Sequence, residues 1–315
     1  MSDTIVTVTL NPAVDEGVAL ESFVLGDVNR CFLSNLDAGG KGLNASRVIR
    51  RLGRETLALG FLGGVTGAMI RARLDEEGVP HAFDEVEGLT RLNVMIYESA
   101  ARRRSRIYLP GPRVDPARLV ELKARLESVA RRVVVLGGSL APGLPESTYG
   151  ELVVWLKAKN VRCVVDSSGA ALAGALAARP ALIKPDVEEA GELLGRTIAG
   201  DDDALCAARE LQRLGAESVV ISQGAAGAIG VGPHGAWKAH APSVLPQSTV
   251  GSGDSMVAGL AIALSEGGDL GEGLRLGTAA GAGTAMTPAA HLCRREDFDA
   301  LLPRVRVEPL RAALR

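Results

Sequence analysis

One acidic residue stands among glycines at the start of a helical pattern. Asp254 follows the segment TVGSG (249–253) and precedes a run with apolar helical spacing. The free N–H groups and positive dipole at the start of a helix suit a phosphate group, and a nearby carboxylate can take a proton from an attacking hydroxyl. A simple helix cap by Asp254 or Ser252 is the alternative. A Walker loop is excluded, because no lysine follows the second glycine.

A second glycine cluster also carries polar side chains that suit a ligand. The segment DAGGKGLNASRVIRRLG (37–53) contains Gly39 and Gly40, which allow a ligand close to the backbone. Lys41 supplies a mobile positive charge, and Asn44 supplies both donors and acceptors. The segment alone fits equally well an ordinary turn between a strand and a helix with a solvated charge.

Alternating strand and helix patterns position these two loops. Short apolar runs that end in Gly, Asp or Pro predict buried strands at 4–10, 56–64, 132–138, 162–166, 181–185 and 218–224. Helical patterns lie at 41–53, 66–78, 116–132, 147–160 and 203–215. This alternation predicts an α/β fold with a central, mostly parallel sheet, whose ligands bind beyond the carboxyl ends of the strands.

Two segments, at about 16–36 and 90–110, alternate polar and apolar residues instead. We expect them to form hairpins that project from the main sheet as a small lid over the strand-end face. Ordinary edge strands are the alternative. The apolar side chains on these short strands also predict a homodimer through the lid.

Composition narrows the class of protein. The chain has 315 residues, of which 47% are hydrophobic, and we expect one domain over 1–315. A net charge of −2 argues against nucleic acid as a partner. The four cysteines lack the spacing of a zinc site and suit reduced thiols in the cytoplasm. We expect no signal peptide and no membrane partner, since the sequence shows neither pattern.

Nine segments, in one order across nearly the whole chain, carry a family resemblance. They are NPAVD (11–15), GDVNR (26–30), AGGKGLNASRVIRRLG (38–53), TRLN (90–93), GSLAPGLP (138–145), VVDSSG (164–169), IKPDVEE (183–189), ISQGAAG (221–227) and STVGSGDSMVAG (248–259). The set resembles the ribokinase-like sugar kinases of the phosphofructokinase-B family. It is most similar to the branch with minor 6-phosphofructokinase, 1-phosphofructokinase and tagatose-6-phosphate kinase. The resemblance implies an ATP-dependent kinase with a Rossmann-type α/β/α sandwich and a β-sheet lid.

The resemblance also implies roles for individual residues. Asp254 would be the catalytic base, and Gly251, Ser252 and Gly253 would form the anion hole. The sugar phosphate would contact Asp15, Gly39, Gly40, Asn44 and Ser139, with Arg30 and Arg91 on its phosphate and Lys41 on that phosphate or on the one transferred. ATP would contact Lys184, Asp186, Ser222, Gly224, Gly227, Ser248, Thr249 and Gly251. Glu189 would act indirectly on Mg²⁺.

Some positions depart from the family pattern. Asp186 stands where the family usually has Asn, and Ser252 stands where Ala is commoner. The segment TPAAHLC (287–293) also differs in a loop that helps some relatives to bind a monovalent cation, so that such a site stays open.

The sequence leaves alternatives for the sugar substrate and for the class of protein. TRLNVMIYE (90–98) and VVDSSG favour fructose 6-phosphate, which is the substrate that we expect, whereas GDVNR and AGGKGLN (38–44) favour the alternatives, fructose 1-phosphate and tagatose 6-phosphate. Two other classes of protein are a nucleotide-binding regulatory module and an NAD-dependent dehydrogenase. The dehydrogenase is disfavoured, because no G-x-G-x-x-G follows the first strand.

Overall fold

The computed structural model describes residues 4–129, 132–288 and 291–310. Its body is built on one ten-stranded sheet. In sheet order the strands are β14 (Arg306–Leu310), β13 (Gly235–His240), β12 (Ala228–Gly232), β11 (Ser218–Ser222), β10 (Leu182–Ile183), β9 (Arg162–Asp166), β8 (Val133–Gly137), β1 (Ile5–Thr9), β4 (Thr56–Leu62) and β5 (His81–Glu85). The strands from β11 to β5 run parallel, and β12 to β14 form an antiparallel edge.

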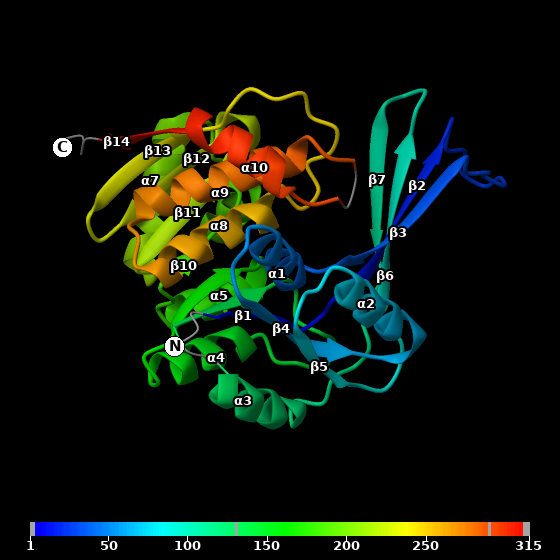
Figure 1. Ribbon diagram of the computed structural model, residues 1–315, viewed down its shortest axis with the longest axis horizontal. Coiled ribbons are helices and arrows are strands. Elements are labelled where there is room, and N and C mark those ends of the chain that lie inside the picture. The colour runs from blue at the N-terminus through cyan, green and yellow to red at the C-terminus, as the bar shows by residue number, and fades with distance from the viewer. Residues whose placement is uncertain (1–3, 130–131, 289–290, 311–315) are drawn as a thin grey trace.

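Helices cover both faces of this sheet (Figure 1). One face packs against α3 (Arg118–Val129), α4 (Thr148–Lys157), α5 (Gly169–Ala177), α6 (Val187–Leu194) and α7 (Gly200–Leu214). The other face packs against α1 (Lys41–Arg51), α8 (Ser252–Glu266), α9 (Leu270–Ala285) and α10 (Arg295–Leu301). The α/β fold expected from the alternating pattern is therefore confirmed, and so is the α/β/α sandwich that the family resemblance implied. None of the helices in the described ranges is both long and apolar enough to cross a membrane.

A second, four-stranded sheet projects from the body (Figure 1). Its strands, in order, are β3 (Leu33–Gly39), β2 (Ala13–Leu20), β6 (Arg91–Glu98) and β7 (Arg103–Tyr108). Its base joins the body where Val14 and Ala38 pack with residues of α1 and α2 (Gly64–Glu76). This is the predicted lid, and the expected turn between its last two strands lies at residues 99–102.

Candidate active site

The glycine loop before Asp254 opens α8 in a conformation that glycine favours. Gly251 is the N-cap residue of α8, with a left-handed φ of 81°. A Cβ added there would lie 2.5 Å from Leu292 Cδ2, so a larger residue would strain the backbone and displace the end of the Leu292 side chain. No side chain in the described structure caps this helix, and Asp254 lies inside its first turn. The capping alternative is therefore wrong, and another reason is needed for the acid.

Asn44 holds the carboxylate of Asp254 across the two glycine clusters. Asn44 Nδ2 in α1 donates a hydrogen bond of 2.8 Å to Asp254 Oδ2, although the residues are 210 positions apart. Burial raises the pKa of Asp254 to about 6, and the Asp166 carboxylate adds to the rise against the opposing effects of Lys41, Asn44 and Lys184. A carboxylate with a pKa just below neutrality is suited to accept a proton at physiological pH.

Two lysines and two acids form a charged cluster beside Asp254. Lys41 Nζ donates to Asp166 Oδ1 at 3.1 Å and to Glu189 Oε1 at 2.9 Å, and Lys184 Nζ lies 3.4 Å from Asp166 Oδ1. Burial would raise the pKa of Asp166, but Lys184 and Lys41 outweigh it and hold that pKa below its usual value. Asp166 is not among the site residues expected from the sequence. Its position at the carboxyl end of a buried strand, in the quoted segment VVDSSG, was the available signal.

The lid contributes a second acid to the same region. Asp15 on β2 accepts a hydrogen bond of 2.8 Å from Asn93 Nδ2 on β6, its direct cross-strand neighbour. Burial raises the pKa of Asp15, and the opposing effects of Asn93 and Arg91 do not cancel this rise. A Cβ on Gly39 would overlap the Asp15 carboxylate, so any larger residue there would displace that carboxylate. Asn93 is a further residue that the sequence argument did not single out.

Arg91 and Ser139 meet through Asn11, which follows β1. Arg91 Nε and Nη2 donate to the Asn11 carbonyl oxygen at 3.2 and 3.0 Å. The Asn11 side chain in turn donates to Ser139 Oγ at 3.2 Å. The structure thus brings Arg91 and Ser139 together. It does not bring Arg30 to them, because Arg30 is exposed in the segment that joins β2 to β3.

The KPDVEE segment has a local structural role as well. Asp186 caps α6, accepting hydrogen bonds from the backbone of Glu188 and Glu189, and Glu189 Oε2 accepts from the Asp186 N–H. This capping box explains an acid where the family usually has Asn, since both residues cap helices well.

Glu189 uses its other oxygen on Lys41, so direct metal coordination would break an existing contact. Among the described residues, no group of three or more His, Cys, Asp or Glu is arranged to hold a metal.

The remaining residues expected on ATP lie in two loops. Ser222 forms an isolated β-bridge with Asp186, and a Cβ on Gly224 would meet open space. Ser248 is buried and its Oγ accepts from the Val250 N–H at 3.3 Å, whereas Thr249 is exposed.

Gly227 differs from these residues, because its own packing accounts for it. Its φ is 92°, and a Cβ there would overlap the carbonyl oxygen of Ala239. Glycine is therefore required at this position whether or not a nucleotide is bound.

Several buried polar atoms of this region lack a hydrogen-bond partner within the described residues. They are Thr9 Oγ1, Asn11 Oδ1, Asn44 Oδ1, Asn93 Oδ1, Asp166 Oδ2 and Ser252 Oγ. Buried polar atoms in folded proteins normally have partners. Their concentration at one end of the sheet fits a polar, hydroxyl-rich and phosphorylated ligand.

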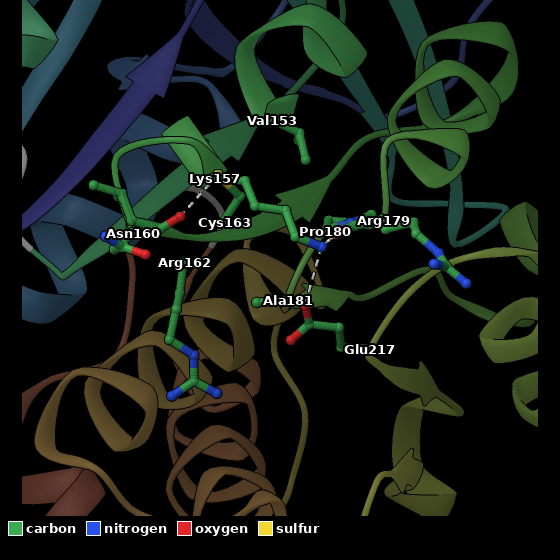
Figure 2. Close-up of a pocket in the computed structure, with 10 residues that line it drawn as sticks. Val153, Lys157, Asn160, Arg162, Cys163, Arg179, Pro180, Ala181 and Glu217 are labelled. Carbon is green, nitrogen blue, oxygen red and sulfur yellow. Dashed lines mark hydrogen bonds and ion pairs between the residues drawn. The ribbon is translucent and has the colours of Figure 1, made fainter. Parts of the chain in front are cut away.

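A separate pocket of about 220 Å³ lies at the amino ends of the parallel strands, opposite the end where Asp254 lies (Figure 2). It is lined by residues at the amino ends of β9 to β11, including Arg162, Ala181 and Glu217. Lys157 spans it, donating to the Arg179 carbonyl oxygen at 3.2 Å and to Glu217 at 3.3 Å. Lys157 is exposed and engaged in these local contacts, whereas the buried charged cluster lies at the carboxyl ends of the strands.

Comparison with known proteins agrees with this geometry. The 1-phosphofructokinase of Rhodobacter capsulatus is 38% identical over 309 residues, covering 97% of this chain and 98% of that protein. The ATP-dependent 6-phosphofructokinase isozyme 2 of Escherichia coli is 34% identical over 296 residues, covering 93% and 96%. A crystal structure of Escherichia coli phosphofructokinase-2 in complex with fructose-6-phosphate has a TM-score of 0.88 and 32% identity, and it covers 96% of this chain and 98% of that one. The sequence model for pfkB family carbohydrate kinases matches residues 8–296, and the chain belongs to that family.

Proposed function

We propose that the protein transfers a phosphoryl group from MgATP to fructose 6-phosphate, giving fructose 1,6-bisphosphate as in glycolysis. The observation that carries this proposal is the position of Asp254. It combines a helix start that suits phosphate, a hydrogen bond from Asn44 and a pKa of about 6. A general base needs these properties when it takes the proton of the attacking hydroxyl and a neighbouring anion hole binds the transferred phosphoryl group.

Each part of the site has a chemical task in this reaction. Asp254 takes the proton of the attacking sugar hydroxyl. The N–H groups of Gly251 and Gly253 would donate to the phosphoryl oxygens, and the Ser252 N–H, which donates to the Thr249 carbonyl oxygen at 3.2 Å, would have to leave that turn to join them. Lys184, buried at the carboxyl end of β10, lies next to Gly253. Mg²⁺ carried by ATP supplies the remaining neutralisation.

The nucleotide would lie along the KPDVEE loop and the two loops that follow. Ser222, Gly224, Ser248 and Thr249 border this path, and Glu189 acts on Mg²⁺ only indirectly, because Lys41 and the Asp186 N–H occupy its oxygens. The segment 287–293, which we considered for a monovalent cation, includes residues 289–290, which lie outside the described residues.

The sugar end is supported by Asp15, Asn93, Ser139 and Arg91. A carboxylate and neighbouring amide and hydroxyl groups suit sugar hydroxyls, and the planar fork of Arg91 suits a phosphate. Arg30, on the exposed lid segment, would reach the sugar phosphate only through movement of the lid or from a partner subunit.

Fructose 1-phosphate is the second candidate substrate. Four relatives that are 34–38% identical carry the name 1-phosphofructokinase. Phosphorylation of either fructose monophosphate at its free terminal hydroxyl gives the same bisphosphate, so that the two reactions differ in how the sugar lies between Arg91 and Asp254. Tagatose 6-phosphate differs in the configuration of one hydroxyl and remains a third.

A coupled assay of ADP formation tests the function directly. The substrates are fructose 6-phosphate, fructose 1-phosphate, tagatose 6-phosphate, free fructose and ribose, each with MgATP. We expect kcat/KM to be at least tenfold higher for a fructose monophosphate than for either free sugar. The Asp254→Asn variant serves as the blank for contaminating kinases. Activity restricted to a free sugar, or none with any of the five, would contradict the proposal.

We further propose that the protein forms a homodimer through its lid, in the cytoplasm. The lid exposes large apolar side chains, among them Leu25, Val28, Phe32 and Leu33, each at least 60% exposed. Covering such a patch favours association of identical sheets. We expect a dimeric mass by light scattering at micromolar concentration and a monomeric mass for Phe32→Asp. A monomeric wild type would contradict the dimer.

The four free thiols are consistent with a reducing compartment, which cell fractionation would check.

A further inference from the structure

One face of the lid strand β7 continues the face that holds Asp15. Directly paired residues of neighbouring strands share a face of the sheet. Asp15 pairs with Asn93 and Asn93 with Tyr108, while Gly17 pairs with Met95 and Met95 with Arg106. Arg106 therefore lies on the Asp15 face, one step of two residues further from the base of the lid.

The same face is directed toward the body of the protein. Arg104, the next residue of β7 on this face, donates from Nη2 to the Gln247 carbonyl oxygen at 2.7 Å. Gln247 precedes Ser248 and Thr249, in the loop that leads to the start of α8. Figure 1 shows β7 as the strand of the lid nearest the body.

Arg106 thus occupies the middle of the gap between the two ends of the site. On one side of it are Tyr108 and the Asp15–Asn93 pair, and on the other is Arg104 on the nucleotide loop. Two residues of a strand span about 6.6 Å, so Arg106 lies over the region between the sugar end and the nucleotide end. Its side chain is exposed, and it takes part in no ion pair with any other residue in the described ranges.

The charged cluster in the body does not neutralise a phosphoryl group in transfer, so that a further cation such as Arg106 would stabilise it. Lys41 and Lys184 are already paired with Asp166 and Glu189, and ionised Asp254 brings the group to a net charge of −1. A triphosphate and a sugar phosphate would add further negative charge. Mg²⁺ offsets two charges, so additional cations have to come from outside the cluster, and the lid presents them.

We propose that Arg106 is a catalytic residue whose guanidinium contacts the phosphoryl group during its transfer. This inference rests on the kinase function proposed above. In the step, the bond between the γ-phosphorus and the ADP oxygen breaks, the bond to the sugar oxygen forms, and the hydroxyl proton moves to Asp254. Arg106 keeps its charge throughout and stabilises the oxygens of the group in transfer, as an arginine can in phosphoryl transfer.

The test compares two arginines on opposite faces of β7. Arg106→Gln removes the proposed contact, and Arg106→Lys keeps the charge without the planar fork. Arg103→Gln is the matched control, because Arg103 pairs with Glu98 on the other face. We expect Arg106→Gln to lower kcat by about 10²–10³-fold, Arg106→Lys to recover part of the loss, and Arg103→Gln to stay within threefold of wild type.

Calorimetric binding provides a second measurement that does not depend on turnover. If Arg106 contacts the γ-phosphate, we expect wild type to bind MgATP more tightly than MgADP. The Arg106→Gln variant should reduce the ratio of the two dissociation constants at least tenfold. A kcat for Arg106→Gln close to that of Arg103→Gln, with an unchanged ATP-to-ADP ratio, would overturn the inference. If wild type phosphorylates none of the sugars, the proposed function fails, and the binding ratio still decides whether Arg106 meets the γ-phosphate.

Discussion

Replacing Asp254 with Asn should abolish most turnover and at the same time stabilise the protein at neutral pH. The amide keeps the shape of the side chain, and its oxygen can still accept the hydrogen bond from Asn44. It cannot take a proton, and a general base contributes about 10²–10⁴-fold to rate. We expect kcat to fall by that factor while MgATP binding is retained.

The stability gain follows from the direction of the pKa shift. Burial and Asp166 raise the pKa of Asp254 from 3.8 to about 6, so the folded state holds its proton more tightly than the unfolded state does. Stability from such a group is present below the unfolded pKa and is lost as pH rises through the folded pKa. A shift of about two units corresponds to about 3 kcal/mol at neutral pH. Asp254 retains some exposed surface, so this figure is an upper bound.

Urea unfolding at several pH values measures this effect. The free energy of unfolding of Asp254→Asn, relative to wild type, should increase from about pH 4 to about pH 6 and stay constant above pH 7. In wild type, kcat/KM should rise with pH through about 6, as the base loses its proton. The exposed acid Asp202 in α7 offers a control, because Asp202→Asn should show neither effect. Turnover of Asp254→Asn within a few-fold of wild type, or a stability difference independent of pH, would refute the reasoning.

Three further substitutions test other parts of the site. Arg91→Ala should raise KM for the sugar phosphate about ten- to a hundredfold and leave KM for ATP nearly unchanged, because one charge-assisted hydrogen bond to the sugar phosphate is lost. It should also reduce the preference for the phosphorylated over the free sugar. Steady-state kinetics with both sugar forms checks these effects, and unchanged constants would contradict the role of Arg91. Asp166→Asn should shift the acidic limb of kcat/KM to lower pH, because the carboxylate that helps to raise the pKa of Asp254 is gone. A shift to higher pH would contradict the role given to the cluster. Gly227→Ala should cost about 1–3 kcal/mol more stability than Gly224→Ala in thermal unfolding, because only the Cβ at Gly227 meets backbone, and equal costs would show that packing does not explain that glycine.

The sequence predicted the elements well where hydrophobic periodicity determines them. The six expected parallel strands and the five expected helices are found close to their predicted bounds, and so is the lid, whereas β5, α5 and α6 were not expected. Helix α9 was not expected, because its sequence is rich in Gly and Ala and lacks a polar face. The antiparallel edge β12–β14 was not foreseen, since strands of only five or six residues carry a weak periodic pattern.

The site was predicted only as far as its glycine loops and quoted motifs reach. Asp254 and Asn44 were both named, but the hydrogen bond between them joins α1 to α8 across 210 residues and no spacing rule could predict it. The pairing of Lys41 with Asp166 and Glu189 is equally remote in sequence. Gly227 shows the opposite difficulty, because a motif glycine that seemed to serve ATP is already required by its own backbone conformation.

Helix α1 explains how these distant groups keep one geometry. Its residues 41, 44, 47 and 51 follow each other at intervals of three or four and so share one side of the helix. Lys41 contacts the charged cluster and Asn44 contacts the base. Arg47, which is buried, donates to both carboxylate oxygens of Asp37 at the base of the lid.

The last residue of that series reaches the loop behind the anion hole. Arg51 donates at 2.9 Å to the carbonyl oxygen of Leu292, whose side chain packs against Gly251. A buried ion pair such as Arg47–Asp37 adds little net stability, because desolvation offsets the attraction, but it does fix orientation. One helix therefore sets the base, the anion-hole loop and the lid in a common frame. A base and an anion hole that act on the same phosphoryl group need this arrangement, since a displacement of about 1 Å between them can cost a hundredfold in rate.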